Sequence, residues 1–220
     1  MASVLPIPRE LTSDILQAAS QCIVADGVLA VATESVYALA AGAKHPRAID
    51  RISAMKGDRE SKPILLLVSS KKQVLQVVSA LSPIAEYLID RFWPGPLTLI
   101  LPAVPNLPFA LTAGTNTIGI RQPAQPQLLQ LLEAVGPLTG TSANRSGLSP
   151  ATTSEEIMRE FGEEVDMILD SGPAPGGLPS TLLSVVDDIR VLRHGPITNG
   201  HLEEALEPLG QRLQDCSSRS

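Results

Sequence analysis

Residues 63–101 read PILLLVSSKKQVLQVVSALSPIAEYLIDRFWPGPLTLIL, and this stretch decides the fold class. Its run Ile64–Val68 is continuously apolar, which is typical of a strand buried on both faces. Two helical stretches follow, at about Lys71–Ser79 and Pro83–Phe92, and a Pro-Gly turn then leads to the apolar strand Leu97–Leu101. Strands that alternate with helices indicate an α/β fold.

The same alternation extends toward both ends of the chain. Thr12 or Ser13 can cap a first helix that ends near Gly27, and Pro46 can open a second helix. Further strands are expected at 28–32, 117–121 and 138–141, with a helix at 125–133. Near the end, Thr181–Val185 and Arg190–Arg193 flank two aspartates as a hairpin would. The pattern therefore predicts one twisted mixed sheet surrounded by helices.

The bulk composition indicates a single domain. Of the 220 residues, 44% are hydrophobic and only 3% aromatic, so Leu, Ile, Val and Ala must build the core, which favours α/β over a β-sandwich. No Pro, Gly or Ser linker divides the chain. We expect one domain over 1–210 and a flexible C-terminal tail over 211–220.

Cysteine usage and hydropathy point to the cytoplasm. The two cysteines, Cys22 and Cys216, imply neither a disulfide framework nor a thiolate metal site. No apolar run approaches the roughly 20 residues that a membrane helix needs, and the N-terminus lacks a secretory signal pattern. The sequence predicts a soluble cytoplasmic protein with no membrane partner.

The charges are unevenly distributed along the chain. The net charge of −6 argues against sequence-blind binding of nucleic acid over the whole surface. Eight of the 17 Lys and Arg residues nevertheless lie between Lys44 and Lys72, with only three acids among them. An anionic ligand would be attracted to the first half of the chain.

The sequence lacks the best-known phosphate and metal motifs. It contains no GxxxxGK[ST] loop, no GxGxxG after a strand and no HExxH helix. Lys56, Arg59 and Lys62 occupy an expected loop between a helix and a strand, where cationic side chains can converge on a polyphosphate, although a solvated loop is the simpler interpretation. Arg121, at a strand end, could hold a carboxylate with its bidentate fork or form a structural ion pair.

Two polar segments follow expected strands. The loop TSANRSG, residues 141–147, offers hydroxyl, amide and backbone N–H groups that suit a phosphate or adenine, and a capped turn is an equal alternative. Ser180 and Thr181 repeat the pattern after the loop GPAPGGLP. Each segment is a weak signal alone.

Seven segments, taken in order, resemble the successive motifs of the YrdC-type threonylcarbamoyl-adenylate synthase family. They are VATESVYALA (31–40), KGDRESKP (56–63), FWPGPLTLIL (92–101), TIGIR (117–121), TSANRSG (141–147), PST (179–181) and VLRHG (191–195). The resemblance spans nearly the whole chain, and it identifies the chain as a divergent member.

The resemblance implies a fold and an activity. The family fold is a twisted mixed sheet with helices around a large, positively charged cavity. Members join L-threonine, bicarbonate and ATP into threonylcarbamoyl-adenylate and pyrophosphate, with Mg²⁺ expected on the phosphates. A downstream threonylcarbamoyl transferase then modifies tRNA, and direct binding of tRNA or double-stranded RNA by this chain is left open.

The resemblance also assigns roles to residues, position by position. The threonine-binding positions correspond to Thr33, Arg121 and Ser180. The ATP-binding positions correspond to Lys62, Thr117, Ser142, Asn144 and Arg193. The catalytic positions of the basic motif correspond to Lys56 and Arg59, and no metal ligand is assigned.

Two departures from the family pattern favour a second hypothesis. Ala38 replaces a glycine beside the binding site, and Asp58 stands where the K-x-R spacing of the basic motif expects arginine. An acid beside a polyphosphate repels it. The alternative is therefore a nucleotide- or RNA-binding protein on the same scaffold, and a third hypothesis is another carbamoyl- or acyl-adenylate chemistry.

The substitution Asp58→Arg tests this departure. If the acid repels the phosphates, the variant should bind ATP more tightly than the wild type, because a cation replaces an anion beside them. Isothermal titration with ATP measures the change. A fall in ATP affinity would show instead that Asp58 has a role of its own.

Overall fold

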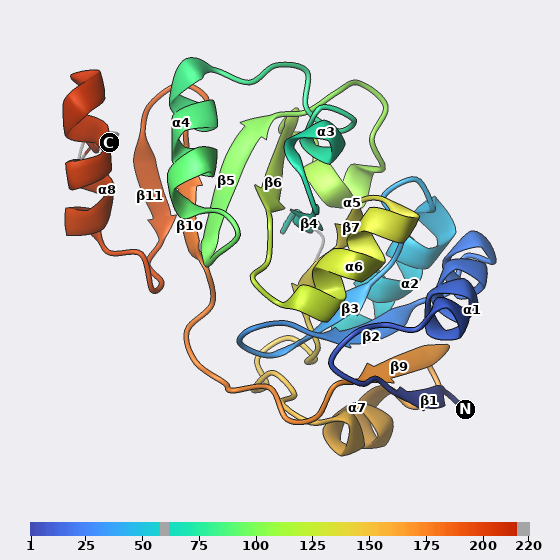
Figure 1. Ribbon diagram of the computed structural model, residues 1–220. Helices are drawn as coiled ribbons and strands as arrows, with labels where there is room; N and C mark the ends of the chain where they lie inside the picture. Colours follow the sequence, from blue (N-terminus) through green and yellow to red (C-terminus); the bar gives the residue numbers. More distant parts are fainter. Residues whose placement is uncertain (58–61, 215–220) are drawn as a thin grey trace.

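The computed structural model describes residues 1–57 and 62–214 and shows an α/β protein (Figure 1). The helices are α1 (Ser13–Val24), α2 (Pro46–Lys56), α3 (Lys71–Val74), α4 (Pro83–Phe92), α5 (Phe109–Thr112), α6 (Pro126–Val135), α7 (Ser154–Phe161) and α8 (Asn199–Leu206), with a 3₁₀ turn at Glu207–Leu209. The predicted helices at residues 13, 46 and 83 begin at those positions.

The described strands form two hydrogen-bonded sheets. The first has the order β1 (Ser3–Pro6), β9 (Met167–Asp170), β2 (Leu29–Ala32), β3 (Tyr37–Ala40) and β8 (Thr141–Ser142). The second has the order β11 (Arg190–Arg193), β10 (Thr181–Ser184), β5 (Leu97–Pro102), β6 (Thr117–Arg121), β4 (Leu66–Leu67) and β7 (Leu138–Thr139).

Both sheets combine parallel and antiparallel pairs, so the mixed α/β fold is confirmed. In the first sheet β2 runs parallel to β9 and antiparallel to β3. In the second, β5 runs parallel to β10 and antiparallel to β6, and β10 and β11 form the predicted antiparallel hairpin.

The expected single sheet is divided at Gly140. Residues 138–141 were expected to form one strand. Instead Leu138–Thr139 form β7 in the second sheet, and Thr141 begins β8 in the first. A Cβ at Gly140 would lie 2.5 Å from Leu67 Cγ, so only glycine lets the backbone pass this close to β4. The chain thus crosses between the sheets at the point where they approach each other.

Two other expected elements are shorter than predicted. The helix expected over Lys71–Ser79 ends at Val74, because Val78 forms an isolated antiparallel bridge with Ala103 instead of continuing the helix. The strand expected over Ile64–Val68 pairs as a strand only at Leu66–Leu67, although Ile64 and Val68 are buried as predicted.

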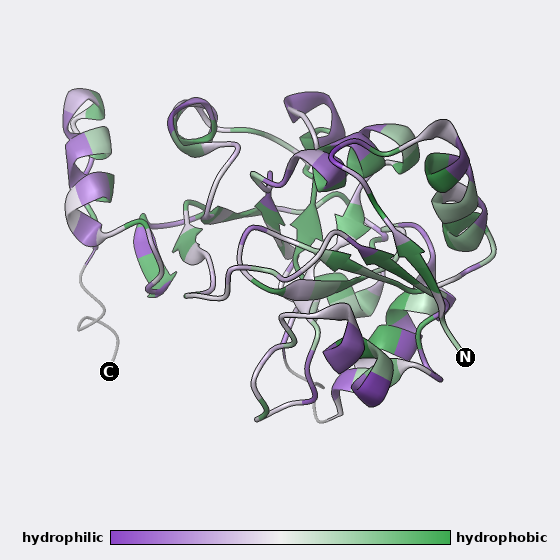
Figure 2. Ribbon diagram, turned by 60° about the horizontal axis from the view of Figure 1, so that its bottom comes forward, coloured by the Kyte–Doolittle hydropathy of each residue, from purple (hydrophilic) through white to green (hydrophobic). Residues whose placement is uncertain are grey.

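The first sheet is buried on both faces. Alternate residues of β2 and β3 point to opposite sides, so Leu29 and Val31 pack with α1 and α6, whereas Ala30 and Leu39 join the larger core with α2 and α7. In Figure 2 the strands are hydrophobic and the hydrophilic residues lie on the outer sides of the helices. This packing fixes the turn between β2 and β3, which carries part of the site.

The C-terminal segment is attached as far as Gln214. Leu213 packs against the core, and the Gln214 N–H donates to the Ile189 carbonyl at 2.7 Å, so the first part of the expected flexible tail is docked. Residues 215–220 lie outside the described part. Within residues 1–57 and 62–214, every helix is too short or too polar to span a membrane.

Candidate active site

A cavity of about 190 Å³ lies where the two sheets meet. Its walls come from the turn between β2 and β3, strands β5 and β6, the crossing segment 140–142, and the segment around Ser180. Five of the residues that the sequence predicts for ligand binding line it together: Thr33, Arg121, Ser142, Ser180 and Arg193. Residues more than 150 positions apart in the chain thus share one cavity.

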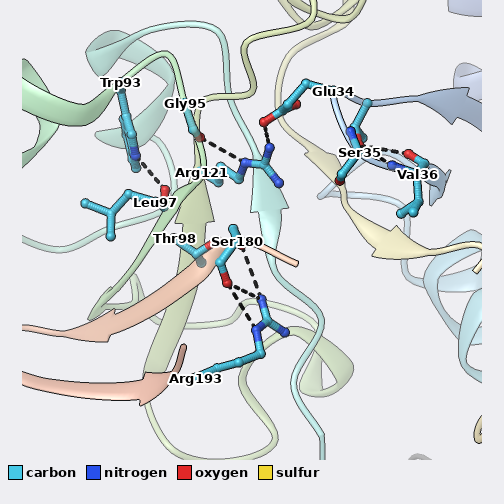
Figure 3. Close-up of polar contacts among 11 residues, drawn as sticks. Glu34, Ser35, Val36, Trp93, Gly95, Leu97, Thr98, Arg121, Ser180 and Arg193 are labelled. Carbon is cyan, nitrogen blue, oxygen red and sulfur yellow. Dashed lines mark hydrogen bonds and ion pairs between the residues drawn. The ribbon is translucent and has the colours of Figure 1, made fainter. Parts of the chain in front are cut away.

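Arg121 occupies the buried end of β6. Its Nε donates to the Gly95 carbonyl at 3.0 Å, and its Nη2 forms an ion pair with Glu34 Oε1 (Figure 3). Burial, and secondarily the nearby Arg193, lower the pKa of Arg121 to about 10. The guanidinium still carries its charge at neutral pH, so the cavity contains a fixed cation that suits a carboxylate.

Arg193 and Ser180 form a second polar group in the cavity. Arg193 donates through Nε and Nη2 to the Ser180 carbonyl at 3.1 and 3.0 Å, and its Nη2 also reaches Ser180 Oγ at 3.2 Å. Ser180 Oγ lies 2.7 Å from the buried Thr98 Oγ1. Burial lowers the pKa of Arg193 as well. Two arginines therefore face the cavity, and Glu34 is the acid paired with one of them.

Thr33 fixes the turn between β2 and β3. Its hydroxyl donates to the Val36 carbonyl at 2.8 Å and accepts from the N–H groups of Ser35 and Val36 at 3.2 and 3.3 Å. Ala38 follows in β3 and lines the cavity, opposite Ser142 of β8. Its methyl group therefore lies in the same cavity as the residues to which the family resemblance assigns ligand binding.

Lys56 is not the loop side chain that the sequence predicted. It is the last residue of α2, only 3% exposed, and its Nζ donates to the Ser142 carbonyl at 2.6 Å and to Asn144 Oδ1 at 2.9 Å. Helix α2 extends to this residue because Ile49, Ile52 and Met55 bury one of its faces. The ammonium thus holds the 142–144 segment beside the cavity.

Asn144 stabilises the same segment, residues 142–144. Its Oδ1 accepts from Lys56 Nζ and from Ser142 Oγ at 2.6 Å, and its Nδ2 donates to the carbonyls of Arg145 and Leu148. These contacts use its amide within the protein, and its side chain borders an adjoining surface groove and not the cavity. Asn144 thus positions Ser142 in this structure, and its ATP contact stays a prediction.

Two further predicted residues in the described ranges, Thr117 and Lys62, do not line the cavity. Thr117 begins β6, about 13 Å along the strand from Arg121, and its hydroxyl pairs with Thr115 Oγ1 at 2.8 Å. Lys62 is exposed and lines a separate groove with Asp50 and Phe109. Arg59, like Asp58, lies outside the described residues.

Glu34 and Thr98 are site residues that the sequence reasoning missed as contacts. Glu34 lies within the motif VATESVYALA and Thr98 within the predicted apolar strand Leu97–Leu101, and neither was assigned a contact. A signal for Glu34 was available, because it is the single charged residue between Asp26 and Lys44. A lone charge within a stretch that is otherwise buried requires a partner.

Comparisons with known proteins place the chain in one family. Residues 21–195 match the Sua5/YciO/YrdC family model, described as "Telomere recombination". The chain therefore belongs to the Sua5/YciO/YrdC family.

The chain is similar to curated threonylcarbamoyl-AMP synthases. A threonylcarbamoyl-AMP synthase of Bacillus subtilis is 38% identical over 185 residues, 83% of this chain and 54% of the relative. One from Thiobacillus denitrificans is 35% identical over 72% of this chain and 85% of its own length. The chain thus spans about half of the Bacillus protein and most of the Thiobacillus one.

Solved structures show the same fold. Pyrococcus abyssi Sua5 complexed with L-threonine has a TM-score of 0.87 at 28% identity, covering 97% of this chain and 62% of that one. Escherichia coli YciO has a TM-score of 0.81 at 26% identity, covering 89% and 97%.

The substitution Lys56→Ala tests the buried ammonium. It removes a charged donor from two acceptors and leaves a cavity, so the free energy of unfolding should fall by about 2–4 kcal/mol. Urea denaturation followed by circular dichroism measures this loss. Lys62→Ala, at an exposed lysine, is the control and should change stability by less than about 0.5 kcal/mol. Equal stability of both variants would contradict the buried role.

Proposed function

We propose that this chain synthesises threonylcarbamoyl-adenylate and pyrophosphate from L-threonine, bicarbonate and ATP, a nucleotidyl transfer. The observation that carries the proposal is the buried Arg121 guanidinium, which presents a fixed cation to a cavity that also holds Ser180, Thr33 and Arg193. The names of the relatives, and the Sua5 structure complexed with L-threonine, support this substrate assignment.

In the proposed reaction the neutral amine of threonine forms a C–N bond to bicarbonate with loss of water, or to carbon dioxide with loss of a proton, and gives a carbamate. A carbamate oxygen then attacks the α-phosphorus of ATP, a new P–O bond forms, and the bond to the pyrophosphate leaving group breaks. This chain would contribute alignment and charge: Arg121 binds the amino-acid carboxylate, and Arg193 and the Ser142 segment face the phosphates. Lys56 would act by positioning Ser142.

The sequence is the basis for the role that we propose for the basic motif, residues 56–63. Arg59 is part of the segment 58–61 and Lys62 follows it. We propose that both contact the polyphosphate, with Thr117 as a further ATP position. Mg²⁺ would neutralise charge on the phosphates. No group of three metal-ligating side chains is found in the described ranges, and this agrees with an ion held chiefly by phosphate oxygens and water.

The proposed product implies a partner reaction. A mixed anhydride of a carbamate and AMP is an activated acyl donor, so a threonylcarbamoyl transferase acting on tRNA would consume it. Whether tRNA or double-stranded RNA also contacts this chain forms part of the alternative hypothesis of a nucleotide- or RNA-binding protein, which Asp58 and Ala38 motivate.

Pyrophosphate release from the purified protein tests the proposal. With ATP and Mg²⁺ present, release should require both L-threonine and bicarbonate. Arg121→Lys should lower kcat/KM for threonine by about 10- to 100-fold, because lysine keeps the charge but not the planar fork. Arg91→Lys, at an exposed ion pair with Glu204, is the matched control and should leave the rate unchanged.

Two outcomes would contradict the proposal. Folded protein that binds ATP but releases no pyrophosphate would favour the binding-protein hypothesis. Release that does not depend on threonine would favour a different adenylate chemistry.

A further inference from the structure

The ion pair between Glu34 and Arg121 is incomplete on the side of the carboxylate. Glu34 Oε1 contacts Arg121 Nη2, but Oε2 is buried and accepts no hydrogen bond from the residues that the structure describes. The side chain as a whole is 24% exposed. Leaving a buried carboxylate oxygen without a donor costs free energy, so this oxygen is suited to a donor that arrives with a ligand.

The ion pair is also incomplete on the side of the guanidinium. Nε of Arg121 donates to the Gly95 carbonyl and Nη2 contacts Glu34, whereas Nη1 has no partner in the ranges 1–57 and 62–214. Arg121 lines the cavity, as do Thr33 and Ser35 on either side of Glu34, and Figure 3 shows Glu34 reaching Arg121 from the side away from Gly95. A free acceptor and a free donor therefore lie on the same ion pair.

The position of Glu34 is fixed by its neighbours. The Thr33 hydroxyl accepts from the two N–H groups that follow Glu34, and the Ser35 carbonyl accepts from the Gly176 N–H at 2.7 Å. This turn is therefore held to the loop before Ser180 as well as to itself. A carboxylate on so constrained a turn is preorganised to select a ligand.

We propose that Glu34 is a further substrate-binding residue, whose Oε2 accepts a hydrogen bond from the α-ammonium of the amino acid while Arg121 Nη1 binds its carboxylate. An α-amino acid carries both charges on one carbon, so it complements an acceptor and a donor that adjoin one another. The inference rests on the proposed function and extends it: Glu34 makes the cavity selective for α-amino acids over otherwise identical acids that lack the α-amine.

A purely structural ion pair accounts for the contacts less well. A bidentate pair would use both carboxylate oxygens on the guanidinium fork, which is the usual geometry of a stabilising Arg–carboxylate pair. Here one oxygen and one nitrogen remain unused. These are the two atoms that a zwitterion needs.

The experiment compares two ligands by isothermal titration with the intact protein. L-threonine carries both charged groups, whereas 3-hydroxybutyrate lacks the amine and keeps the carboxylate and hydroxyl. Glu34→Gln should weaken L-threonine binding by about 10- to 100-fold, because a hydrogen bond between charged groups is lost. Its affinity for 3-hydroxybutyrate should stay within about threefold of the wild type. Glu204→Gln, which alters an exposed Arg–Glu pair, is the control and should change neither affinity.

Several results would overturn the inference. Tighter binding of both ligands to Glu34→Gln would mean that Glu34 competes with the substrate for Arg121. Equal weakening of both would mean that Glu34 only orders the guanidinium. If the variant does not fold, the affinities of the wild type alone test the inference. Equal affinity of the wild type for L-threonine and 3-hydroxybutyrate contradicts it. Failure of the wild type to bind L-threonine would overturn the proposed function together with it.

Discussion

The burial of the Arg121 charge is the constraint on which the site depends. A guanidinium only 8% exposed at a strand end must be surrounded by acceptors, and the protein supplies the Gly95 carbonyl from one side and the Glu34 carboxylate from the other. Arg121 belongs to β6 of the second sheet and Glu34 to the turn between β2 and β3 of the first, so the ion pair also joins the two sheets beside the cavity. The cation is fixed before any ligand arrives, which is the condition for binding a carboxylate without reorganisation.

A second buried cation, Lys56, stabilises the walls of the cavity without lining it. Lys56 at the end of α2 binds the Ser142 carbonyl and Asn144, and thereby fixes the segment that follows the crossing at Gly140. The two cations differ in what they do: Arg121 keeps a nitrogen free for a ligand, whereas Lys56 is directed toward the protein. Alanine variants of the two residues are therefore not equivalent, because loss of Lys56 acts mainly through the fold.

Most of the architecture could be predicted from local patterns, and the exceptions have physical causes. Capped and proline-initiated helices such as α1 and α4 begin where Thr12 and Pro83 place them, because those signals are local. The division into two sheets could not be predicted, since it depends on Gly140 passing close to Leu67, a contact between distant segments. The burial of Lys56 was missed for the same reason. A lysine in a basic stretch gives no sign that two acceptors 86 and 88 residues away will enclose it.

A crystal structure of the protein with L-threonine and a non-hydrolysable ATP analogue tests the central claim most directly. Our account predicts that the amino acid lies between the two sheets, with its carboxylate on Arg121, its ammonium on Glu34, and the phosphates toward Arg193 and Ser142. A threonine located in the groove of Lys62 and Phe109, with the Glu34–Arg121 pair undisturbed and solvent in the cavity, would contradict the account.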